Sequence, residues 1–250
     1  MKRQISTEGL LLKAERFGDI HKSVTIFSPD FGMVQVTAYG AYKSTSRFSG
    51  VTEPFRHVRL NLYHDPVRKS YKITDIELIQ SFDAVQGDLK RFYLVCLWLE
   101  LLGKSSGGAE DYKAVFSLLR EGLVLMNDPL RNAAYVSLTF LIRYIKLMGL
   151  FPGIEECPSC GNVFSHADDI FFSPEDAEFH CSSCSRDGFF RIPAGGVSYL
   201  RHTEDLSFEI ASRVGLDAVT LSCMEETVYE MIRILLGEEL KTLKAIKAYV

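Results

Sequence analysis

The sequence predicts an α+β chain in which a small β-rich domain is followed by a helical domain. Short runs of apolar and β-branched residues fill about the first eighty positions, and helical periodicity takes over after Asp83. A pair of CxxC motifs then interrupts the helical part. We therefore expect domains at residues 1–80 and 81–250, with an inserted cysteine-rich module at residues 155–191.

Five segments of the N-terminal part have the composition and length of short β-strands. They lie at residues 9–17, 22–27, 32–39, 55–63 and 72–80. In the fourth segment, Val58, Leu60 and Leu62 occupy alternate positions with Arg59 and Asn61 between them, as in a strand with one buried face. Five such strands predict a small barrel or sandwich, and among five-stranded barrels we expect an OB-fold.

Three helices are predicted before the cysteine motifs, at residues 89–102, 112–126 and 128–148. The first is apolar on nearly every side, which predicts a buried helix, and residues 103–108 are expected to form a flexible break after it. Asp128 and Pro129 have the residue types of a helix start, and Gly149 is typical of a helix end. Two or three further helices are expected after residue 191, one of them starting with a capping box at Ser222.

Four cysteines, Cys157, Cys160, Cys181 and Cys184, form two CxxC pairs that are separated by 20 residues. Two thiolates at this spacing bind one ion because the backbone between them turns back, and four thiolates complete the tetrahedral coordination of zinc. No coordination position is left for water, so the cluster predicts a structural Zn²⁺ and disfavours a catalytic one. Redox chemistry, iron and a coincidental spacing are the alternative interpretations.

Other candidate ligands carry a weaker signal. His166 and His180 could each replace a thiolate, although surface histidine is the commoner role for such residues. Cys96 and Cys223 lie in or beside apolar helical stretches and have no partner at ligand spacing. We expect both to be small core residues.

Charge is distributed unevenly along the chain. The net charge is −4, yet residues 1–72 contain 12 Lys and Arg against 6 Asp and Glu, whereas the remainder contains 16 against 26. A polyanion would therefore bind the N-terminal part, with chance surface charge as the competing explanation.

The N-terminus lacks the apolar stretch of a secretory signal and no segment is apolar over a membrane-spanning length, which predicts a cytoplasmic protein with reduced thiols.

The sequence contains no catalytic constellation that we recognise, and we do not expect an enzyme. Gly103, Lys104 and Ser105 look like the end of a phosphate-binding loop, but Trp98 stands where that loop requires a glycine. A GxSxG elbow, an HExxH helix and a dinucleotide-binding fingerprint are also absent from the sequence.

Several motifs resemble those of the bacterial recombination mediator family RecO, and they follow the same order along the chain. Residues 7–13 and the following Phe17-Gly18-Asp19 are similar to the first strand of that family, and residues 40–48 to its Gly-Ala-Arg-Lys loop. The leucine- and tyrosine-rich helix at residues 91–102, residues 149–152 ahead of Cys157, and residues 233–242 resemble its later motifs.

The resemblance implies an N-terminal OB-fold barrel followed by a helical domain with an inserted four-cysteine zinc module. It implies binding of single- and double-stranded DNA, annealing of complementary strands, and help in loading RecA onto strands coated by single-strand-binding protein. RecR and the acidic C-terminal tail of single-strand-binding protein are the implied protein partners, in a nucleoid-associated cytoplasmic location. A zinc-stabilised protein–protein adaptor without DNA binding and a zinc hydrolase are the competing hypotheses.

Basic side chains of the β-rich part are the expected DNA contacts. We expect a single track across the barrel that neutralises phosphates and releases counterions, formed by Lys13, Arg16, Lys22, Lys43, Arg47 and Arg56. Tyr39, Tyr42 and Phe48 could stack on bases of any sequence, although barrel packing is an equal role for Phe48. The acidic tail would bind an apolar groove of the helical part that is flanked by Arg131, Arg143, Lys146 and Arg201.

Overall fold

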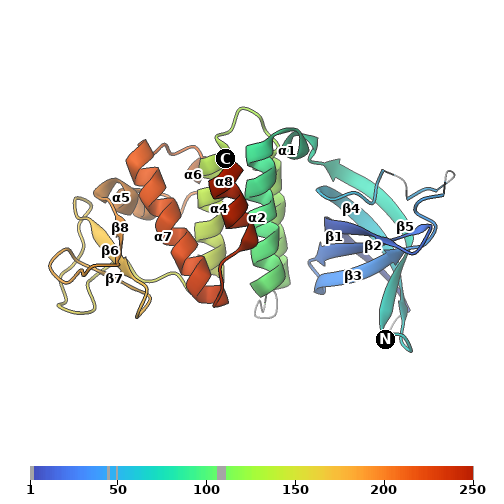
Figure 1. Cartoon of the computed structure of the whole chain (residues 1–250), viewed down its shortest axis with the longest axis horizontal. Coiled ribbons are helices and arrows are strands. Elements are labelled where there is room, and N and C mark those ends of the chain that lie inside the picture. The colour runs from blue at the N-terminus through green and yellow to red at the C-terminus, as the bar shows by residue number, and fades with distance from the viewer. Residues whose placement is uncertain (1–2, 44–45, 49, 106–110, 250) are drawn as a thin grey trace. The chain divides into compact units, whose positions relative to one another are not determined.

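The computed structural model describes residues 3–43, 46–48, 50–105 and 111–249. The chain divides into two compact units, whose elements are labelled in Figure 1. One unit contains the described residues up to Val95 and those from Leu102 to Asn127, and the other contains Cys96–Leu101 and the residues from Asp128 onward. Among the described residues of both units, no α-helix combines the length and the apolar character needed to cross a membrane.

Five strands form the sheet of the first unit. They are β1 (Gln4–Phe17), β2 (His21–Ser28), β3 (Gly32–Ala38), β4 (Arg56–Asp65) and β5 (Ser70–Ser81). The strands pair in the order β1-β2-β3-β5-β4, and β4 pairs back onto β1, so the sheet closes on itself. All five predicted strands are confirmed, and β1 begins earlier than predicted because its first residues pair with the end of β4.

The junctions around this closed sheet differ in length. Four of them are antiparallel and contain at least seven paired positions each. The fifth, between β3 and β5, is parallel and contains two, Val36 with Tyr71 and Thr37 with Lys72. Parallel pairing is also slightly less stable per residue, so β3 and β5 form the weakest junction.

Apolar side chains fill the interior of the closed sheet. Val58, Leu60 and Leu62 are buried there, whereas Arg59 and Asn61 between them are exposed, which confirms the predicted alternation. Each buried side chain of this size contributes about 1.5–3 kcal/mol to folding. Alternation along one strand therefore separates its inward side chains from those that can meet a ligand.

Three helices follow the sheet: α1 (Asp83–Gly87), α2 (Leu89–Ser105) and α3 (Tyr112–Met126). α3 packs on the sheet, where the Tyr112 ring lies 6.4 Å from the Phe27 ring and a Cβ added at Gly32 would come within 2.6 Å of Tyr112. The predicted break at residues 103–108 is wrong for its first three residues, because α2 continues through Ser105. A glycine costs a helix only about 1 kcal/mol, and packing of the helix offsets that cost. The rest of the predicted break lies outside the described residues.

The second unit is mainly helical. Its helices, besides the middle of α2, are α4 (Ala133–Leu147), α5 (Ala194–His202), α6 (Phe208–Ala211), α7 (Ala218–Leu236) and α8 (Lys241–Tyr249). In its core the Trp98 ring stacks on Phe140 at a centroid distance of 4.1 Å. The Glu100 carboxylate accepts the backbone N–H groups of Lys241 and Thr242 and so caps α8. Within the residues that the structure describes, four helices follow the cysteine motifs, one more than the predicted maximum, because the short α6 lacks a helical pattern long enough to recognise.

Two predicted helix starts are wrong by several residues. Asn132, rather than Asp128, caps α4 by accepting a hydrogen bond from the backbone of the second helical residue. Asp217, rather than Ser222, caps α7 by accepting two backbone N–H groups, and Ser222 lies inside that helix. Both segments contain several residues able to cap, and the position of the core-facing side chains selects among them.

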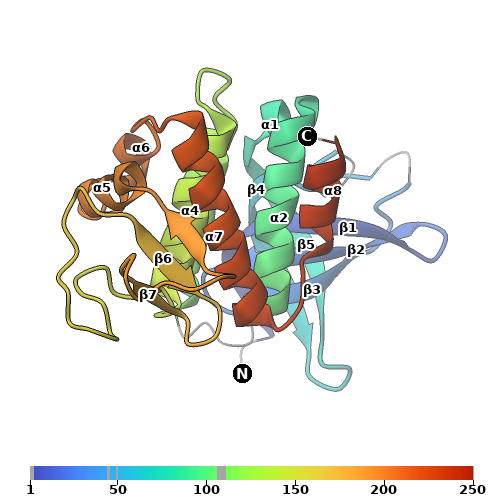
Figure 2. The same cartoon turned by 60° about the vertical axis from the view of Figure 1, so that its left-hand side comes forward.

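A three-stranded sheet that was not predicted lies in the cysteine-rich module. It consists of β6 (Ile170–Ser173), β7 (Glu178–His180) and β8 (Phe190–Ile192), in the order β7-β6-β8. Figure 2 shows it close to α5 and α7, and β8 contacts both of these helices. Strands of three or four residues are too short for alternation to stand out in a sequence.

Candidate nucleic-acid groove and metal centre

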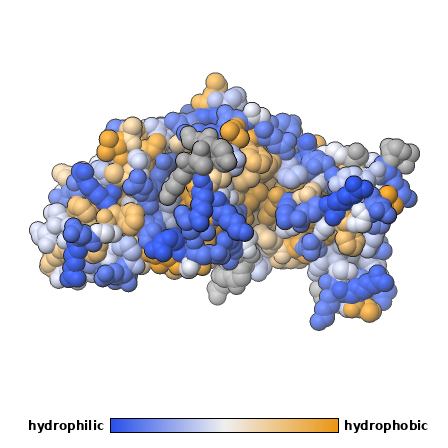
Figure 3. Space-filling view, in the orientation of Figure 1, coloured by the Kyte–Doolittle hydropathy of each residue, from blue (hydrophilic) through white to orange (hydrophobic). Residues whose placement is uncertain are grey.

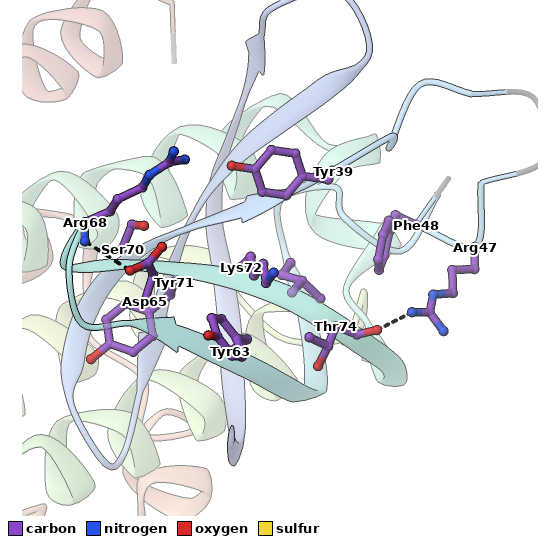
Figure 4. Close-up of a pocket in the computed structure, with 11 residues that line it drawn as sticks. Tyr39, Arg47, Phe48, Tyr63, Asp65, Arg68, Ser70, Tyr71, Lys72 and Thr74 are labelled. Atoms are coloured by element: carbon purple, nitrogen blue, oxygen red, sulfur yellow. Dashed lines mark hydrogen bonds between the residues drawn. The ribbon is translucent and has the colours of Figure 1, made fainter. Parts of the chain in front are cut away.

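A groove of about 560 Å³ opens on the first unit beside the junction of β3 and β5. Its lining, drawn in Figure 4, comes from the end of β3, from β4, from β5 and from the loops between these strands. The lining residues are Tyr39, Arg47, Phe48, Tyr63, Asp65, Arg68, Ser70, Tyr71, Lys72, Ile73 and Thr74. Aromatic rings and cations therefore outnumber the single carboxylate in the groove.

Two of the three tyrosines of this groove, Tyr71 and Tyr39, lie against other rings. Tyr71 lies 4.8 Å from the His64 ring and 6.3 Å from the Phe31 ring, measured between centroids. Tyr39 is 49% exposed and meets the His21 ring edge-on at 4.8 Å. Side chains that are already ordered lose little conformational freedom when a planar ligand stacks on them.

Three cations line the groove together with these rings. The Lys72 ammonium lies 4.4 Å from the centroid of the Tyr63 ring, a cation–π distance. The Arg47 guanidinium donates to the carbonyl of Thr74 and lies 3.4 Å from Asp75. Arg68 lies on the turn that joins β4 to β5.

The carboxylate of the groove supports that turn. Asp65 Oδ1 accepts the backbone N–H groups of Val67, at 2.9 Å, and Arg68, at 3.1 Å. The hydrogen bond from Arg68 is the main reason why the pKa of Asp65 is lowered. The carboxylate is thus ionised at neutral pH, and it orders the loop that carries Arg68.

The six residues of the predicted DNA track are not equally available. Four have a carboxylate within salt-bridge distance: Lys13 with Glu15, Lys22 with Glu53, Arg47 with Asp75 and Arg56 with Asp83. Arg16 donates to the carbonyls of Gly18 and Asp19, and Lys43 is exposed. Of the six, Arg47 lines the groove.

Lys22 differs most from its predicted role. It is 5% exposed, its ammonium bonds Glu53, and it lies 5.1 Å from the centroid of the Tyr42 ring. Lys22 has the same parity along β2 as the buried Val24 and Ile26, so the sequence already contained the signal for its burial. It holds the loop after β3 against β2.

The three aromatic residues predicted to stack on bases also differ in their exposure. Phe48 is 7% exposed and packs in the core of the closed sheet, while also forming one wall of the groove. Tyr42 is 48% exposed and lies beneath the Arg16 guanidinium, at 5.5 Å. Tyr39 is the predicted stacking residue that lines the groove as an exposed ring.

Eight groove residues were not among the predicted site residues, and the aromatic or basic ones among them are Tyr63, Arg68, Tyr71 and Lys72. Tyr63 has the parity of the exposed Arg59 and Asn61 along β4, which marks it as an outward-facing ring. An outward aromatic on one strand, followed by a basic turn, was the available signal. The pairing of β3 with β5 that brings Tyr39 to the same groove has no local signal.

The four predicted metal ligands lie together in the second unit. The sulfur atoms of Cys157, Cys160, Cys181 and Cys184 all lie within 4.8 Å of one another. Each CxxC segment folds into a tight turn: the Gly161 N–H donates to the Cys157 carbonyl at 2.8 Å, and the Cys184 N–H donates to the Cys181 carbonyl at 3.1 Å. The spacing of the motifs thus predicted the cluster in full.

The geometry of the cluster suits a tetrahedral thiolate centre. A zinc–sulfur bond of about 2.3 Å places two tetrahedral sulfurs about 3.8 Å apart, and Cys160 Sγ lies 3.7 Å from Cys181 Sγ. Burial of Cys157 opposes its ionisation, but backbone N–H groups of Cys181, Ser159 and Cys160 lower its pKa to about 6. Hydrogen bonding with Cys160 and Cys181 raises the pKa of Cys184 to about 12.

His180 is not the surface histidine that was expected. It is 5% exposed, with Nδ1 3.1 Å from Ser159 Oγ and 4.0 Å from Cys157 Sγ, and Nε2 3.0 Å from Asp176 Oδ2. Pairing of β6 with β7 buries it, which the sequence pattern did not reveal. His166 is exposed, as expected.

The remaining cysteines stay apart from this cluster. Cys96 and Cys223 are both partly buried. Burial, together with Glu100, raises the pKa of the Cys96 thiol to about 11. At neutral pH Cys96 is therefore a protonated packing residue, in agreement with its predicted role.

A second cavity, of about 220 Å³, lies between α4 and α5. Apolar side chains such as Ile142 and Leu200 line it together with Arg143, Lys146 and Glu204. Lys146 Nζ lies 2.8 Å from the Glu204 carboxylate. Two of the four basic residues predicted to flank a peptide groove therefore meet at one cavity.

The other two predicted groove residues have structural partners. Arg131 binds the carboxylate of Glu209 at 2.8 Å. Arg201 donates to the backbone carbonyls of Ile154, at 2.8 Å, and Phe164, at 2.7 Å. Both guanidinium groups join segments of the second unit.

The chain is similar to known proteins over most of its length. The family model described as "Recombination protein O N terminal" matches residues 1–82, and the model "Recombination protein O C terminal" matches residues 86–244. A protein named "DNA repair protein RecO" from Syntrophus aciditrophicus is 26% identical over 96% of this chain and 94% of its own length. Proteins of the same name from Rubrobacter xylanophilus (28% identical; 84% of this chain, 85% of the relative) and Symbiobacterium thermophilum (24%; 84% of each) are also similar. With both halves matched in order, the chain belongs to the recombination protein O family.

Proposed function

We propose that this chain acts in DNA repair and recombination by binding single-stranded DNA in the groove beside β3 and β5. The observation that carries the proposal is the convergence of Tyr39 and Tyr63 with Arg47, Arg68 and Lys72 in one groove. The name "DNA repair protein RecO" of the curated relatives supports it. We also propose that the closed sheet is an OB-fold, since its strand order agrees with a five-stranded barrel of that type.

Binding in the groove needs no sequence readout. Every base has a π-face, so the tyrosines can stack on any base, while the cations neutralise phosphates and release counterions. Duplex DNA would use the cations alone, because its bases are already stacked. Annealing of complementary strands follows from the same screening, which lowers the repulsion between two bound backbones and requires no catalytic group.

We propose that the four cysteines hold one structural Zn²⁺ ion. Both CxxC turns would hold the ion and so be joined through it; one turn precedes β6 in the sequence and the other follows β7. Four thiolates would fill its coordination sphere, so a hydrolytic role is not part of the proposal. Ion binding would add folding free energy directly to this module.

The cavity between α4 and α5 is our candidate site for the acidic tail of single-strand-binding protein. Its apolar lining suits a hydrophobic side chain, and Lys146 and Arg143 would attract carboxylates. Partnership with RecR and assistance to RecA are also parts of the proposal, which family membership supports without locating a surface for either.

One titration tests the peptide site. Glu204→Gln removes the carboxylate that pairs with Lys146 and should tighten binding of an acidic peptide severalfold, whereas Lys146→Glu should abolish it. A peptide of scrambled sequence and equal charge is the control. Equal affinity of both variants would exclude the cavity as the site.

The competing function is a zinc-stabilised adaptor that binds proteins only. Fluorescence anisotropy with labelled single-stranded DNA, measured at several salt concentrations, separates the two. Three groove cations predict a slope of log affinity against log salt of about −2. An adaptor would give no saturable, salt-dependent binding.

A further inference from the structure

His180 links the two halves of the cysteine cluster. It immediately precedes Cys181 of the second CxxC turn, and its Nδ1 lies 3.1 Å from the hydroxyl of Ser159, which belongs to the first. The same nitrogen lies 4.0 Å from Cys157 Sγ. The imidazole therefore joins, through side chains alone, two turns that are separated by 20 residues in the sequence.

The orientation of this ring is fixed from its other side. Nε2 lies 3.0 Å from the Asp176 carboxylate, which can only accept a hydrogen bond when ionised. In the neutral ring the proton therefore resides on Nε2, and Nδ1 is left to accept the Ser159 hydroxyl proton. The Phe189 ring, 5.3 Å away between centroids, packs against the imidazole.

Ser159, His180 and Asp176 have the connectivity of a hydrolytic triad, but their surroundings do not support hydrolysis. An acyl-transfer site needs backbone N–H groups aimed at a developing oxyanion beside the nucleophile. Here the N–H groups of Ser159 and Cys160 donate to Cys157 sulfur, and that of Gly161 donates to the Cys157 carbonyl. The arrangement instead serves the cysteine cluster.

We propose that His180 is a positioning residue for the metal centre, holding the Ser159 turn in register with the Cys181 turn so that four sulfurs converge. The proposal rests on the proposed zinc site. Residues that orient metal ligands from outside the coordination sphere commonly change metal affinity by about 10–100-fold. His180 and Ser159 should therefore act as one unit, with Asp176 holding the ring.

Substitutions that remove or keep the Ser159 contact test this role in the full-length chain. His180→Phe keeps a ring against Phe189 and loses both polar contacts, whereas His180→Asn places an amide where Nδ1 lies. Each variant is loaded with Co²⁺, followed by its thiolate charge-transfer absorption, and then titrated with Zn²⁺ in competition. We expect His180→Phe to bind Zn²⁺ about 10–100-fold more weakly and His180→Asn to recover most of that loss.

Two further variants complete the experiment. Ser159→Ala should weaken binding as His180→Phe does, and the double variant should be no weaker than either, because one contact is lost in each case. His166→Phe, at an exposed histidine, should bind as the unmodified chain does. If His180→Phe does not fold, His180→Asn and Ser159→Ala still decide the matter.

The outcomes separate this inference from the zinc site itself. Unchanged Zn²⁺ affinity in His180→Phe, or additive losses in the double variant, would overturn the positioning role while leaving the metal centre intact. Recovery absent from His180→Asn would also overturn it. An unmodified chain that gives no thiolate–cobalt absorption would remove the metal centre, and the inference with it.

Discussion

The Lys72 ammonium lies 4.4 Å from the centroid of the Tyr63 ring, so a cation and an aromatic face occupy the same part of the groove. They come from neighbouring strands, Tyr63 from β4 and Lys72 from β5, where the two residues are directly paired. A phosphate bound at Lys72 would therefore bring its own base close to Tyr63. Because a cation and an aromatic ring lie together here, we expect the groove to bind single-stranded DNA more tightly than free anions.

Loss of a stacking ring should weaken DNA binding without changing its salt dependence. We expect Tyr39→Ala to reduce single-strand affinity by about 1–3 kcal/mol, because one base loses its stacking partner. Tyr39→Phe keeps the ring and should bind normally, which makes it the matched control. Anisotropy titrations with a labelled oligonucleotide measure both, and equal affinity of the alanine variant would show that bases do not stack there.

Loss of a groove cation should change the salt dependence itself. Lys72→Gln should reduce the magnitude of the log–log salt slope by about 0.7, the value of one phosphate contact on a single strand. Lys22→Met should leave the slope unchanged, because Lys22 is buried and already paired with Glu53. The reverse result would favour the track predicted from the sequence over the groove.

The zinc content of the purified protein should depend on the four clustered cysteines and not on the other two. We expect one Zn²⁺ per chain, lost in Cys160→Ser and retained in Cys223→Ser, as measured by elemental analysis of purified protein. Chelation should destabilise the module around β6 and β7, since binding of the ion contributes directly to its folding free energy. Retention of zinc by Cys160→Ser would mean that the remaining donors suffice.

The free energy of unfolding of the chain should decrease as the pH is lowered, because of a buried histidine in the first unit. Burial, the largest cause, lowers the pKa of His57 below 6.5, with Arg120 and Arg59 adding to it and the hydrogen bond to Glu8 opposing it. The unfolded chain then binds a proton more readily than the folded chain, so stability is complete above pH about 6.5 and decreases as pH falls from there toward the folded pKa.

Urea unfolding at several pH values measures this effect. His57→Gln keeps a donor for Glu8 but cannot titrate, so the difference in unfolding free energy between the two proteins should change between pH about 7.5 and 5. The other histidines are common to both proteins and cancel. Parallel pH profiles would contradict the assignment to His57.

Local patterns were sufficient for the five strands of the first unit and for the four clustered cysteines. Alternation of Val58, Leu60 and Leu62 predicted β4, and the spacing of two CxxC motifs predicted four converging sulfurs. Both signals are complete within a few residues. The helix starts at Asn132 and Asp217 were missed because several capping residues stand close together, and tertiary packing selects one.

The candidate groove could not be predicted in the same way. Tyr63 lies in β4, Tyr71 lies in β5 and Tyr39 directly follows β3, and the junction between β3 and β5 has only two paired positions. Charge alone suggested Lys22, yet its parity in β2 directs it inward toward Glu53. A basic residue is therefore informative only together with the face of the strand that carries it.

The short parallel junction has a mechanical consequence. Local opening of the closed sheet should occur at the junction with the fewest paired positions. That junction pairs Val36–Thr37 of β3 with Tyr71–Lys72 of β5. Two of these residues, Tyr71 and Lys72, also line the groove together with Tyr39. A DNA strand bound in the groove would contact residues of this junction and stabilise the paired state. Amide protons at the junction should therefore exchange with solvent more slowly when DNA is bound.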